Sequence, residues 1–314
     1  MTSTGTRTVE HEIRVQAGAD AVYRLIADVA NWPQIFPPSV HVEHLERGDR
    51  QERIQIWATA NGEAKTWQSR RVLDPAARRV EFRQEVSQPP VAAMAGTWII
   101  EDAGEGASRV RLLHEFRAVD DDPDKLEWID RAVDTNSTVE LAALKANAEL
   151  ATGDSGLLFT FDDTVHIDGS AKDVYEFINQ AQLWEQRLPH VARVSLREDG
   201  PGLQLLEMDT RAKDGSVHTT SSVRVCLPYE KIVYKQIVLP ALMSLHTGQW
   251  LFEEQDAGVA VTSRHTVAIN EANIARVLGA DATVAGTRDY LHTALSTNSL
   301  ATLQHARRHV EGTA

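Results

Sequence analysis

The sequence predicts an α+β fold that occurs twice in tandem, each copy being a curved antiparallel sheet wrapped on a long C-terminal helix. Three observations support this prediction: a repeat of the whole pattern, consecutive segments in which apolar and polar residues alternate, and a long helical segment at the end of each copy. In the repeat, Trp32 recurs as Trp184 and Trp98 recurs as Trp250. A shift of about 150 residues indicates a duplicated domain, because solenoid repeats span only about 20 to 50 residues.

Within the first copy, each element follows from its own residue pattern. Residues 9–15 alternate as a strand, and residues 20–29 carry apolar side chains at helical spacing. A short, Pro-rich helical or turn segment is expected at 31–38. Six more strands are then expected between turns rich in Gly, Asn, Asp and Pro, at 41–47, 52–60, 64–73, 79–87, 95–102 and 108–117. A final helix is expected from about Pro123 to Leu150, with Gly153 just beyond its end.

The limits of the two domains follow from the same pattern. We expect one domain at 1–152 and a second at 158–314, joined by a short linker that contains Gly153. The match of Ser137 to Ser299 has a wider spacing than the earlier matches. The second copy is therefore expected to carry about ten extra residues before its last helix.

Composition limits the classes of partner. The formal net charge of −13 argues against nucleic acid, which is bound through clustered Lys and Arg. No apolar run approaches the length of a membrane span, and the polar N-terminus has no apolar signal core, so we expect a cytoplasmic protein without a membrane partner. A neutral or apolar small molecule fits best. An acidic carrier protein remains a second possible partner, if it docks on a basic patch formed by Arg70, Arg78, Arg79 and Arg83.

The same composition argues against a cofactor. Cys226 is the only cysteine, which leaves no disulfide framework and no thiolate metal site. The 12 His show no metal-ligand spacing, and no Gly-rich loop joins a strand to a helix. We expect neither a metal nor a nucleotide.

Three polar residues of the first copy are expected on apolar inner faces, around a cavity between sheet and helix. Strand alternation places Arg71 and His114 there, and the apolar stripe of the last helix places Asp134 there. Buried charges are costly unless paired or functional, so a purely structural network is one interpretation and a reaction site is the other. Apolar and small polar side chains are expected to line the cavity with them: Trp32, Trp67, Ser69, Phe82 and Trp98.

The second copy keeps part of this set. Arg224 and His265 match Arg71 and His114, whereas Ser296 stands where the first copy has Asp134. Three further residues are expected near that cavity, namely Ser222, Tyr234 and Trp250. We therefore expect the first copy to be the catalytic one, with the reverse assignment open.

Several motifs together resemble one known family. The Trp32-Pro33 pair, the strand 67–71 (Trp-Gln-Ser-Arg-Arg), the Gly96-Thr97-Trp98 segment and the doubled layout are similar to the di-domain aromatase/cyclases of bacterial type II polyketide synthases. These enzymes belong to the helix-grip superfamily, also called START-like or Bet v 1-like. The resemblance covers essentially the whole chain and implies a poly-β-ketone substrate on an acyl carrier protein, supplied by a minimal synthase and ketoreductase. It further implies closure of the first ring between carbons 7 and 12 of a ketoreduced chain, in antibiotic biosynthesis.

The resemblance also implies roles for the inner residues. Arg71 would stabilise the oxyanion of an aldol closure, and His114 would take and return a proton, with Asp134 orienting the imidazole. Some relatives use a Tyr after the first helices, where this chain has Ser39. Two alternatives remain open, a non-catalytic carrier of an apolar ligand and a scaffold module of a synthase complex.

Overall fold

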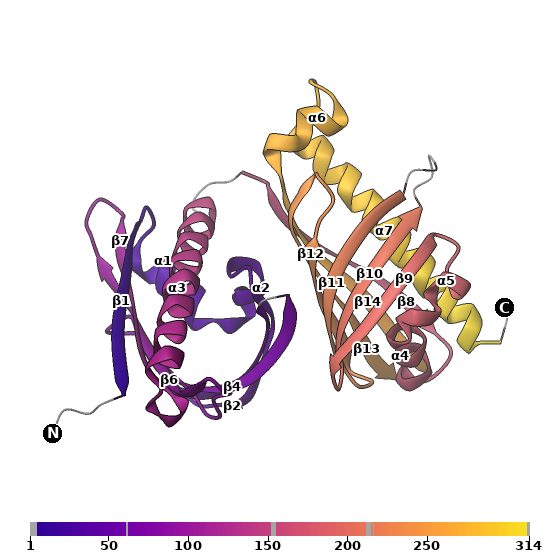
Figure 1. Cartoon of the computed structure of the whole chain (residues 1–314). Helices are drawn as coiled ribbons and strands as arrows, with labels where there is room; N and C mark the ends of the chain where they lie inside the picture. The colour runs from indigo at the N-terminus through magenta and orange to yellow at the C-terminus, as the bar shows by residue number, and fades with distance from the viewer. Residues whose placement is uncertain (1–4, 61, 152–154, 212–214, 216, 313–314) are drawn as a thin grey trace. The chain divides into compact units, whose positions relative to one another are not determined.

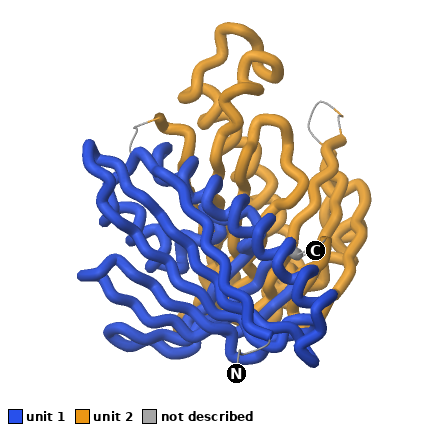
Figure 2. The backbone as a smooth tube through the Cα atoms, turned by 60° about the vertical axis from the view of Figure 1, so that its left-hand side comes forward, with its two compact units in different colours: residues 1–58, 65–154 blue, residues 59–64, 155–314 orange. Residues whose placement is uncertain are grey.

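The computed structural model describes residues 5–60, 62–151, 155–211, 215 and 217–312 (Figure 1). The chain divides into two compact units, coloured separately in Figure 2. Unit 1 comprises 1–58 and 65–154, and unit 2 comprises 59–64 and 155–314. The expected domain limits at residues 152 and 158 stay a prediction, and Gly153 lies outside the described residues.

Unit 1 contains one seven-stranded sheet in the order β1-β7-β6-β5-β4-β3-β2. Its elements, in chain order, are β1 (Thr6–Val15), α1 (Ala19–Ala27), α2 (Trp32–Ile35), β2 (Ser39–Arg47), β3 (Gln51–Ala60), β4 (Glu63–Asp74), β5 (Arg79–Gln84), β6 (Val91–Asp102), β7 (Ser108–Ala118) and α3 (Pro123–Ala151). Single 3-10 turns precede α2 and α3, at Val29–Asn31 and Val119–Asp121. The strand pairs that are described are all antiparallel.

Unit 2 repeats this order as β8-β14-β13-β12-β11-β10-β9. Its elements are β8 (Leu158–Ile167), α4 (Ala171–Asn179), α5 (Trp184–Arg187), β9 (Val191–Gly200), β10 (Leu203–Arg211), β11 (Val217–Leu227), β12 (Lys231–Val238), β13 (Met243–Gln255), β14 (Gly258–Ile269), α6 (Ile274–Leu278) and α7 (Val284–Val310). A 3-10 turn at Ala181–Leu183 precedes α5, and another at Glu271–Asn273 precedes α6. The extra residues expected before the last helix form α6 and the turn before it.

Local chemistry explains where the helices begin. Pro123 opens α3, where its missing N–H is not needed. The Ser170 hydroxyl accepts a hydrogen bond from the Asp173 backbone N–H and caps α4, and Thr283 caps α7 through the Gly286 N–H. These caps fix the residue at which each helix starts.

The long helix of unit 1 packs on the inner face of its sheet. On α3 an apolar stripe at helical spacing is buried, formed by Leu141, Leu144 and Ala148. It joins one core cluster with inner residues of the sheet, namely Trp98, Ile100, Val110 and Leu112. The predicted helix-grip architecture of a sheet wrapped on its last helix is confirmed.

One strand boundary differs from the expectation. The strand predicted at 79–87 ends at Gln84, and Val86 is 73% exposed. Pro89 and Pro90 follow closely, and proline cannot donate a ladder hydrogen bond, so the chain leaves the sheet before them. The next strand starts at Val91, earlier than predicted.

Candidate functional site

Four residues of unit 1 form a row across the sheet, one on each of four neighbouring strands. Register pairs Arg71 on β4 with Phe82 on β5, Phe82 with Gly96 on β6, and Gly96 with His114 on β7. Opposite residues of paired strands point to the same face, so these side chains share one face. Arg71 is buried, whereas its neighbour Arg70 is exposed, which agrees with the predicted alternation.

Gly96 makes room for the ring that joins the two ends of this row. A Cβ atom at Gly96 would overlap Cζ of Phe82 and the carbonyl oxygen of Leu113. The Phe82 ring therefore lies over the glycine and meets the His114 imidazole edge to face, with 5.6 Å between centroids. The aromatic ring thus fills the space between the arginine and the histidine.

Arg71 is held by a complete set of partners. Its side chain is 1% exposed, and Nη1 lies 2.5 Å from Oε1 of Glu52, itself buried on β3. Nη2 donates to the Ile26 carbonyl at 2.7 Å and Nη1 to the Ala27 carbonyl at 3.2 Å, at the C-terminal end of α1. The guanidinium also lies 5.0 Å from the ring centre of Trp32. The charge of Arg71 is therefore compensated by a carboxylate and by a helix C-terminus.

His114 is a largely buried, neutral imidazole. Burial lowers its pKa to about 4, with a smaller contribution from His11. Its Nδ1 lies 3.4 Å from the hydroxyl of Ser137 on α3. At neutral pH this imidazole is therefore available to accept a proton.

The expected inward position of Asp134 is wrong. Its side chain is 73% exposed, and its carboxylate lies 2.9 Å from Nε2 of His11 on β1, so Asp134 is on the surface and not in the core. The buried stripe of α3 runs from Ser137 to Val133 and Ile129 in steps of four residues, so Asp134 lies beside it and faces outward. Ser296 in unit 2 takes the same place and contacts Asp163, which matches His11.

Unit 2 contains the matching row. Arg224 on β11 pairs with Tyr234 on β12, Tyr234 with Gly248 on β13, and Gly248 with His265 on β14. A Cβ atom at Gly248 would overlap the Tyr234 ring, as at Gly96. The glycine again lets an aromatic ring span the row, but here the ring carries a hydroxyl.

That hydroxyl belongs to a buried hydrogen-bonded network around His265. Nδ1 of His265 lies 3.2 Å from the Tyr234 hydroxyl and 2.9 Å from Nε2 of His246. Nε2 lies 2.7 Å from the hydroxyl of Ser299 on α7 and 3.1 Å from Ser263. Burial lowers the pKa of His246 to about 3 and that of His265 to about 4, and it raises the pKa of Tyr234. The whole network is therefore neutral at pH 7.

Arg224 lacks the counter-ion that Arg71 has. It is 2% exposed, donates from Nη2 to the Ile178 carbonyl at 2.8 Å, and lies 5.3 Å from the ring centre of Trp184. The residue opposite it on β10 is Gln204, which stands where unit 1 has Glu52. Among the described residues, Nη1 of Arg224 has no hydrogen-bond partner.

The expected lining residues divide into two groups. Trp98 and Trp250 lie in the hydrophobic cores, and Trp67 packs against a separate apolar cluster on β2 and β3. The Ser69 hydroxyl donates a hydrogen bond to the Arg83 carbonyl. Ser222 is buried on β11, two residues before Arg224. The residues that lie at the row itself are Trp32, Phe82 and Tyr234.

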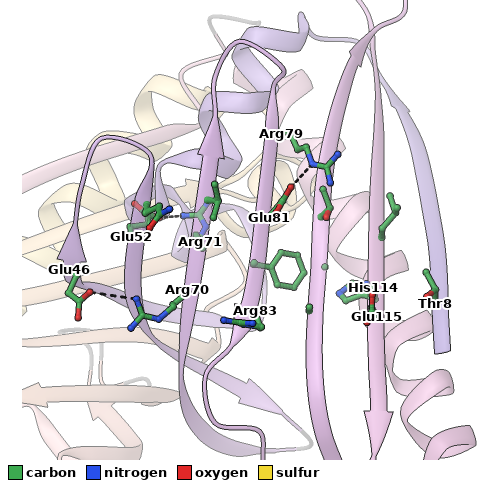
Figure 3. Close-up of a pocket in the computed structure, with 17 residues that line it drawn as sticks. Thr8, Glu46, Glu52, Arg70, Arg71, Arg79, Glu81, Arg83, His114 and Glu115 are labelled. Carbon is green, nitrogen blue, oxygen red and sulfur yellow. Dashed lines mark hydrogen bonds and ion pairs between the residues drawn. The ribbon is translucent and has the colours of Figure 1, made fainter. Parts of the chain in front are cut away.

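A hollow of about 560 Å³ lies along the sheet of unit 1, and all four residues of its row contribute to the lining. The charged side chains that line it come from the adjacent strand positions, which face the opposite side of the sheet from the row, so the hollow lies on the outer face. Figure 3 shows two of their ion pairs, Arg70 with Glu46 and Arg79 with Glu81. The cavity predicted between sheet and helix stays a prediction.

Three residues at these sites were missed by sequence reasoning: Glu52, Ser137 as a partner of His114, and Gln204. A signal exists for two of them. Glu52 shares strand parity with the apolar Ile54 and Ile56, which indicates a buried acid. Ser137 lies at helical spacing from Leu141 and Leu144 and recurs as Ser299, which indicates a polar group facing the inner histidine.

Other kinds of site find little support in the described residues. No group of three or more His, Cys, Asp or Glu that could hold a metal ion occurs among them. In the part of the chain that the structure describes, no helix is both long and apolar enough to cross a membrane.

Comparison with known proteins gives one consistent result. Residues 6–149 match one family, and residues 167–287 a related one, both described as polyketide cyclase/dehydrase and lipid transport. The granaticin polyketide synthase bifunctional cyclase/dehydratase of Streptomyces virginiae is 54% identical over 301 residues, covering 94% of this chain and 97% of that protein. The actinorhodin polyketide synthase bifunctional cyclase/dehydratase of Streptomyces coelicolor is 47% identical over 316 residues, covering 98% of each.

Solved structures agree over the same length. The di-domain ARO/CYC BexL from the BE-7585A biosynthetic pathway has a TM-score of 0.93 at 64% identity, covering 97% of this chain and 99% of that one. The di-domain ARO/CYC StfQ from the steffimycin pathway has a TM-score of 0.88 at 34% identity, with the same coverage.

Proposed function

The chain belongs to the polyketide cyclase/dehydrase family, and from this premise we propose that it is a bifunctional cyclase and dehydratase of a type II polyketide synthase. Its substrate is a poly-β-ketone bound to an acyl carrier protein and reduced at one ketone. The enzyme folds this chain, closes the first ring by an intramolecular aldol reaction between carbons 7 and 12, and dehydrates the product to an aromatic ring. No cofactor takes part.

The observation that carries the proposal is the row of arginine, aromatic ring and histidine, present in both units. Arg71 and His114 have the chemistry that aldol closure needs, as do Arg224 and His265. The arginine supplies fixed N–H donors, and the histidine is unprotonated at neutral pH because burial lowers its pKa to about 4 in each unit.

The reaction steps balance with these groups alone. The histidine takes a proton from a methylene between two carbonyls, and the carbanion forms a carbon–carbon bond to a distant ketone. The oxygen of that ketone becomes an oxyanion, which the arginine N–H groups stabilise, an effect typically worth about 3 to 4 kcal/mol of barrier. The protonated histidine then returns its proton, and the hydroxyl leaves as water after a second proton is removed from the adjacent carbon.

Asp134 has no part in this proposal, because its carboxylate is exposed and contacts His11 on β1. Ser137 and Ser299 take the orienting role instead, since each lies against the inner histidine from the last helix. They are positioning residues that fix the imidazole without adding charge.

The basic patch considered for the carrier protein is largely neutralised. Arg70 pairs with Glu85 at 2.6 Å, Arg78 with Asp20 at 2.5 Å, and Arg79 with Glu81 at 3.0 Å. A carrier protein is therefore part of the proposal through its bound substrate, and this patch is not assigned as its docking surface.

Reconstitution with a minimal synthase and ketoreductase tests the proposal. We expect wild type to yield aromatised product, and His114→Phe with His265→Phe to divert the chain to unaromatised shunt products by mass spectrometry. Phenylalanine keeps the volume and the ring contacts. Correct folding of the double variant is checked by circular dichroism. If the double variant yields the wild-type product profile, the chain is a carrier of an apolar ligand or a scaffold module and not the cyclase.

A further inference from the structure

The two units differ at the end of the row that holds the arginine. In unit 1 the charge of Arg71 is balanced by Glu52, whose second oxygen lies 3.0 Å from Nε2 of His44. In unit 2 the residue opposite Arg224 is Gln204, which is 4% exposed and carries no charge. One exchange of Glu for Gln therefore leaves unit 2 with a buried cation that has no carboxylate beside it.

Three buried polar atoms, on Arg224 itself and on two neighbouring side chains, have no hydrogen-bond partner among the described residues. They are Nη1 of Arg224, Nε1 of Trp184 and Oε1 of Gln204. In unit 1 the matching Nη1 of Arg71 reaches Glu52, and the matching Nε1 of Trp32 donates to the Ile26 carbonyl at 3.1 Å. Unit 2 thus has two unsatisfied N–H donors on neighbouring side chains, because the Arg224 guanidinium lies over the Trp184 ring, 5.3 Å from its centre.

Such an arrangement is unfavourable unless something fills it. A buried charge without a partner costs several kcal/mol, and a buried donor without an acceptor costs about 1 to 3 kcal/mol. Arginine cannot relieve this by losing its proton at physiological pH. An anionic oxygen supplies the acceptor that Nη1 lacks and cancels the charge.

The neighbouring groups leave that charge intact. The ionisable side chains that act on Arg224 are Cys226, Tyr175 and Tyr234, and burial raises the pKa of each, so all three are neutral at pH 7. His265 and His246, further along the same row, are also neutral. The inner face of unit 2 therefore presents one net positive charge at the arginine end.

We propose that unit 2 binds the anionic oxygen of an enolate at Arg224 and Trp184. Gln204 makes this possible because it is uncharged, whereas Glu52 provides a counter-ion in unit 1. The choice of an enolate rests on the proposed function, because β-diketones are the acidic groups of a poly-β-ketone. The two units then differ in what competes with that oxygen: the Glu52 carboxylate competes for Arg71 in unit 1, and no carboxylate stands opposite Arg224 in unit 2.

The test uses a small cyclic β-diketone, cyclohexanedione, which is mainly the enolate at neutral pH. Its O-methyl enol ether has the same ring but cannot ionise. Binding is followed by isothermal titration calorimetry on the full chain, with tryptophan fluorescence as a second readout. Wild type is expected to bind one cyclohexanedione per chain and to bind the enol ether at least ten-fold more weakly.

Two reciprocal variants isolate the counter-ion. Gln204→Glu completes an ion pair with Arg224, so we expect at least ten-fold weaker binding together with a higher melting temperature. Glu52→Gln removes the pair in unit 1, so we expect a second binding event per chain. Trp184→Phe keeps the ring but removes the N–H donor, and a several-fold weakening is expected.

Clear outcomes overturn the inference. Unchanged binding in folded Gln204→Glu, or equal binding of the enol ether, means that Arg224 is not an enolate site. If Gln204→Glu does not fold, Glu52→Gln decides, and the absence of an added binding event overturns the proposal. The binding assay is independent of turnover. A chain that binds the enolate but forms no ring contradicts the proposed function alone, and one that forms rings without binding the enolate contradicts this inference alone.

Discussion

At the scale of single residues, the two glycines of the rows have a defined steric task. Gly96 and Gly248 lie under the rings of Phe82 on β5 and Tyr234 on β12, which reach towards the histidine strand of each unit. Any side chain at either glycine would push that ring away. The Gly-Thr-Trp and Gly-Gln-Trp segments of the sequence therefore reflect close packing rather than a turn.

Gly96→Ala tests this steric role. The added methyl group meets backbone as well as the Phe82 ring, so we expect a loss of about 1 to 3 kcal/mol in the free energy of unfolding, typical of overpacking. Urea denaturation monitored by circular dichroism measures it. Gly200→Ala is the matched control, because a Cβ atom there meets nothing within 4 Å. A similar small effect at both positions contradicts the steric role.

Buried histidines make stability depend on pH. The pKa of His246 is lowered from 6.5 to about 3, so the unfolded chain binds a proton between these values and the folded chain does not. Stability is therefore fully present above about pH 6.5 and is lost as the pH falls towards 3, by up to about 1.4 kcal/mol for each pH unit. His114 and His265 act in the same direction.

His246→Met isolates one of these contributions. Unit 1 has Met94 at the matching position, so methionine fits this site in the fold. We expect the variant to lose less stability than wild type between about pH 7 and about pH 5.5. Thermal unfolding at the two pH values measures the difference. An identical loss in both proteins means that His246 is protonated in the folded state.

At the scale of elements, Arg71 joins three parts of unit 1. It ties β4 to the buried acid of β3 and to the last carbonyls of α1, at Ile26 and Ala27. A helix of nine residues gains stability from such a cation at its C-terminus. Arg71 therefore has a structural task beside any role in the reaction.

Arg71→Met measures that structural task. It leaves the Glu52 carboxylate buried without its partner, and we expect a loss of about 3 to 5 kcal/mol in the free energy of unfolding. The double variant Arg71→Met with Glu52→Gln removes both charges and is expected to recover much of the loss. Chemical denaturation of wild type, the two single variants and the double variant gives the coupling energy. Additive effects of the two substitutions mean that the pair is not energetically coupled.

The sequence predicted the elements well because alternation and turn residues are local signals. Every strand and the long helix of unit 1 were expected, and so was the inward position of Arg71 and His114. Asp134 was misplaced because a helix stripe can continue by three or by four residues: before Ser137 it continues to the buried Val133, which leaves Asp134 exposed. Glu52 was missed because its pairing with Arg71 depends on strand register, which the sequence does not state.

At the scale of the whole molecule, duplication allows one fold to carry two chemical environments. The rows of the two units match strand by strand, yet Glu52, Phe82 and Met94 are replaced by Gln204, Tyr234 and His246. Each replacement lies on the inner face, and none alters the strand order. The scaffold is therefore insensitive to the changes that distinguish the sites.

Separate production of residues 1–152 and 158–314 tests whether each unit folds on its own. Each has its own hydrophobic core, and about 150 residues suffice for a stable domain. We expect each half to show a single cooperative thermal transition by circular dichroism, with the full chain as the control. Non-cooperative melting of either half contradicts the predicted domain limits.

The register of the row has a consequence for substrate size. Arg71 and His114 are three strands apart, and neighbouring strands lie about 4.8 Å from each other, so their Cα atoms are separated by about 14 Å. A fragment the size of one diketone can touch only one end of the row, whereas an extended chain can touch both. Because the strand spacing belongs to the backbone, substitutions within the row can change what each end binds but not the number of strands that a molecule must cross to reach both.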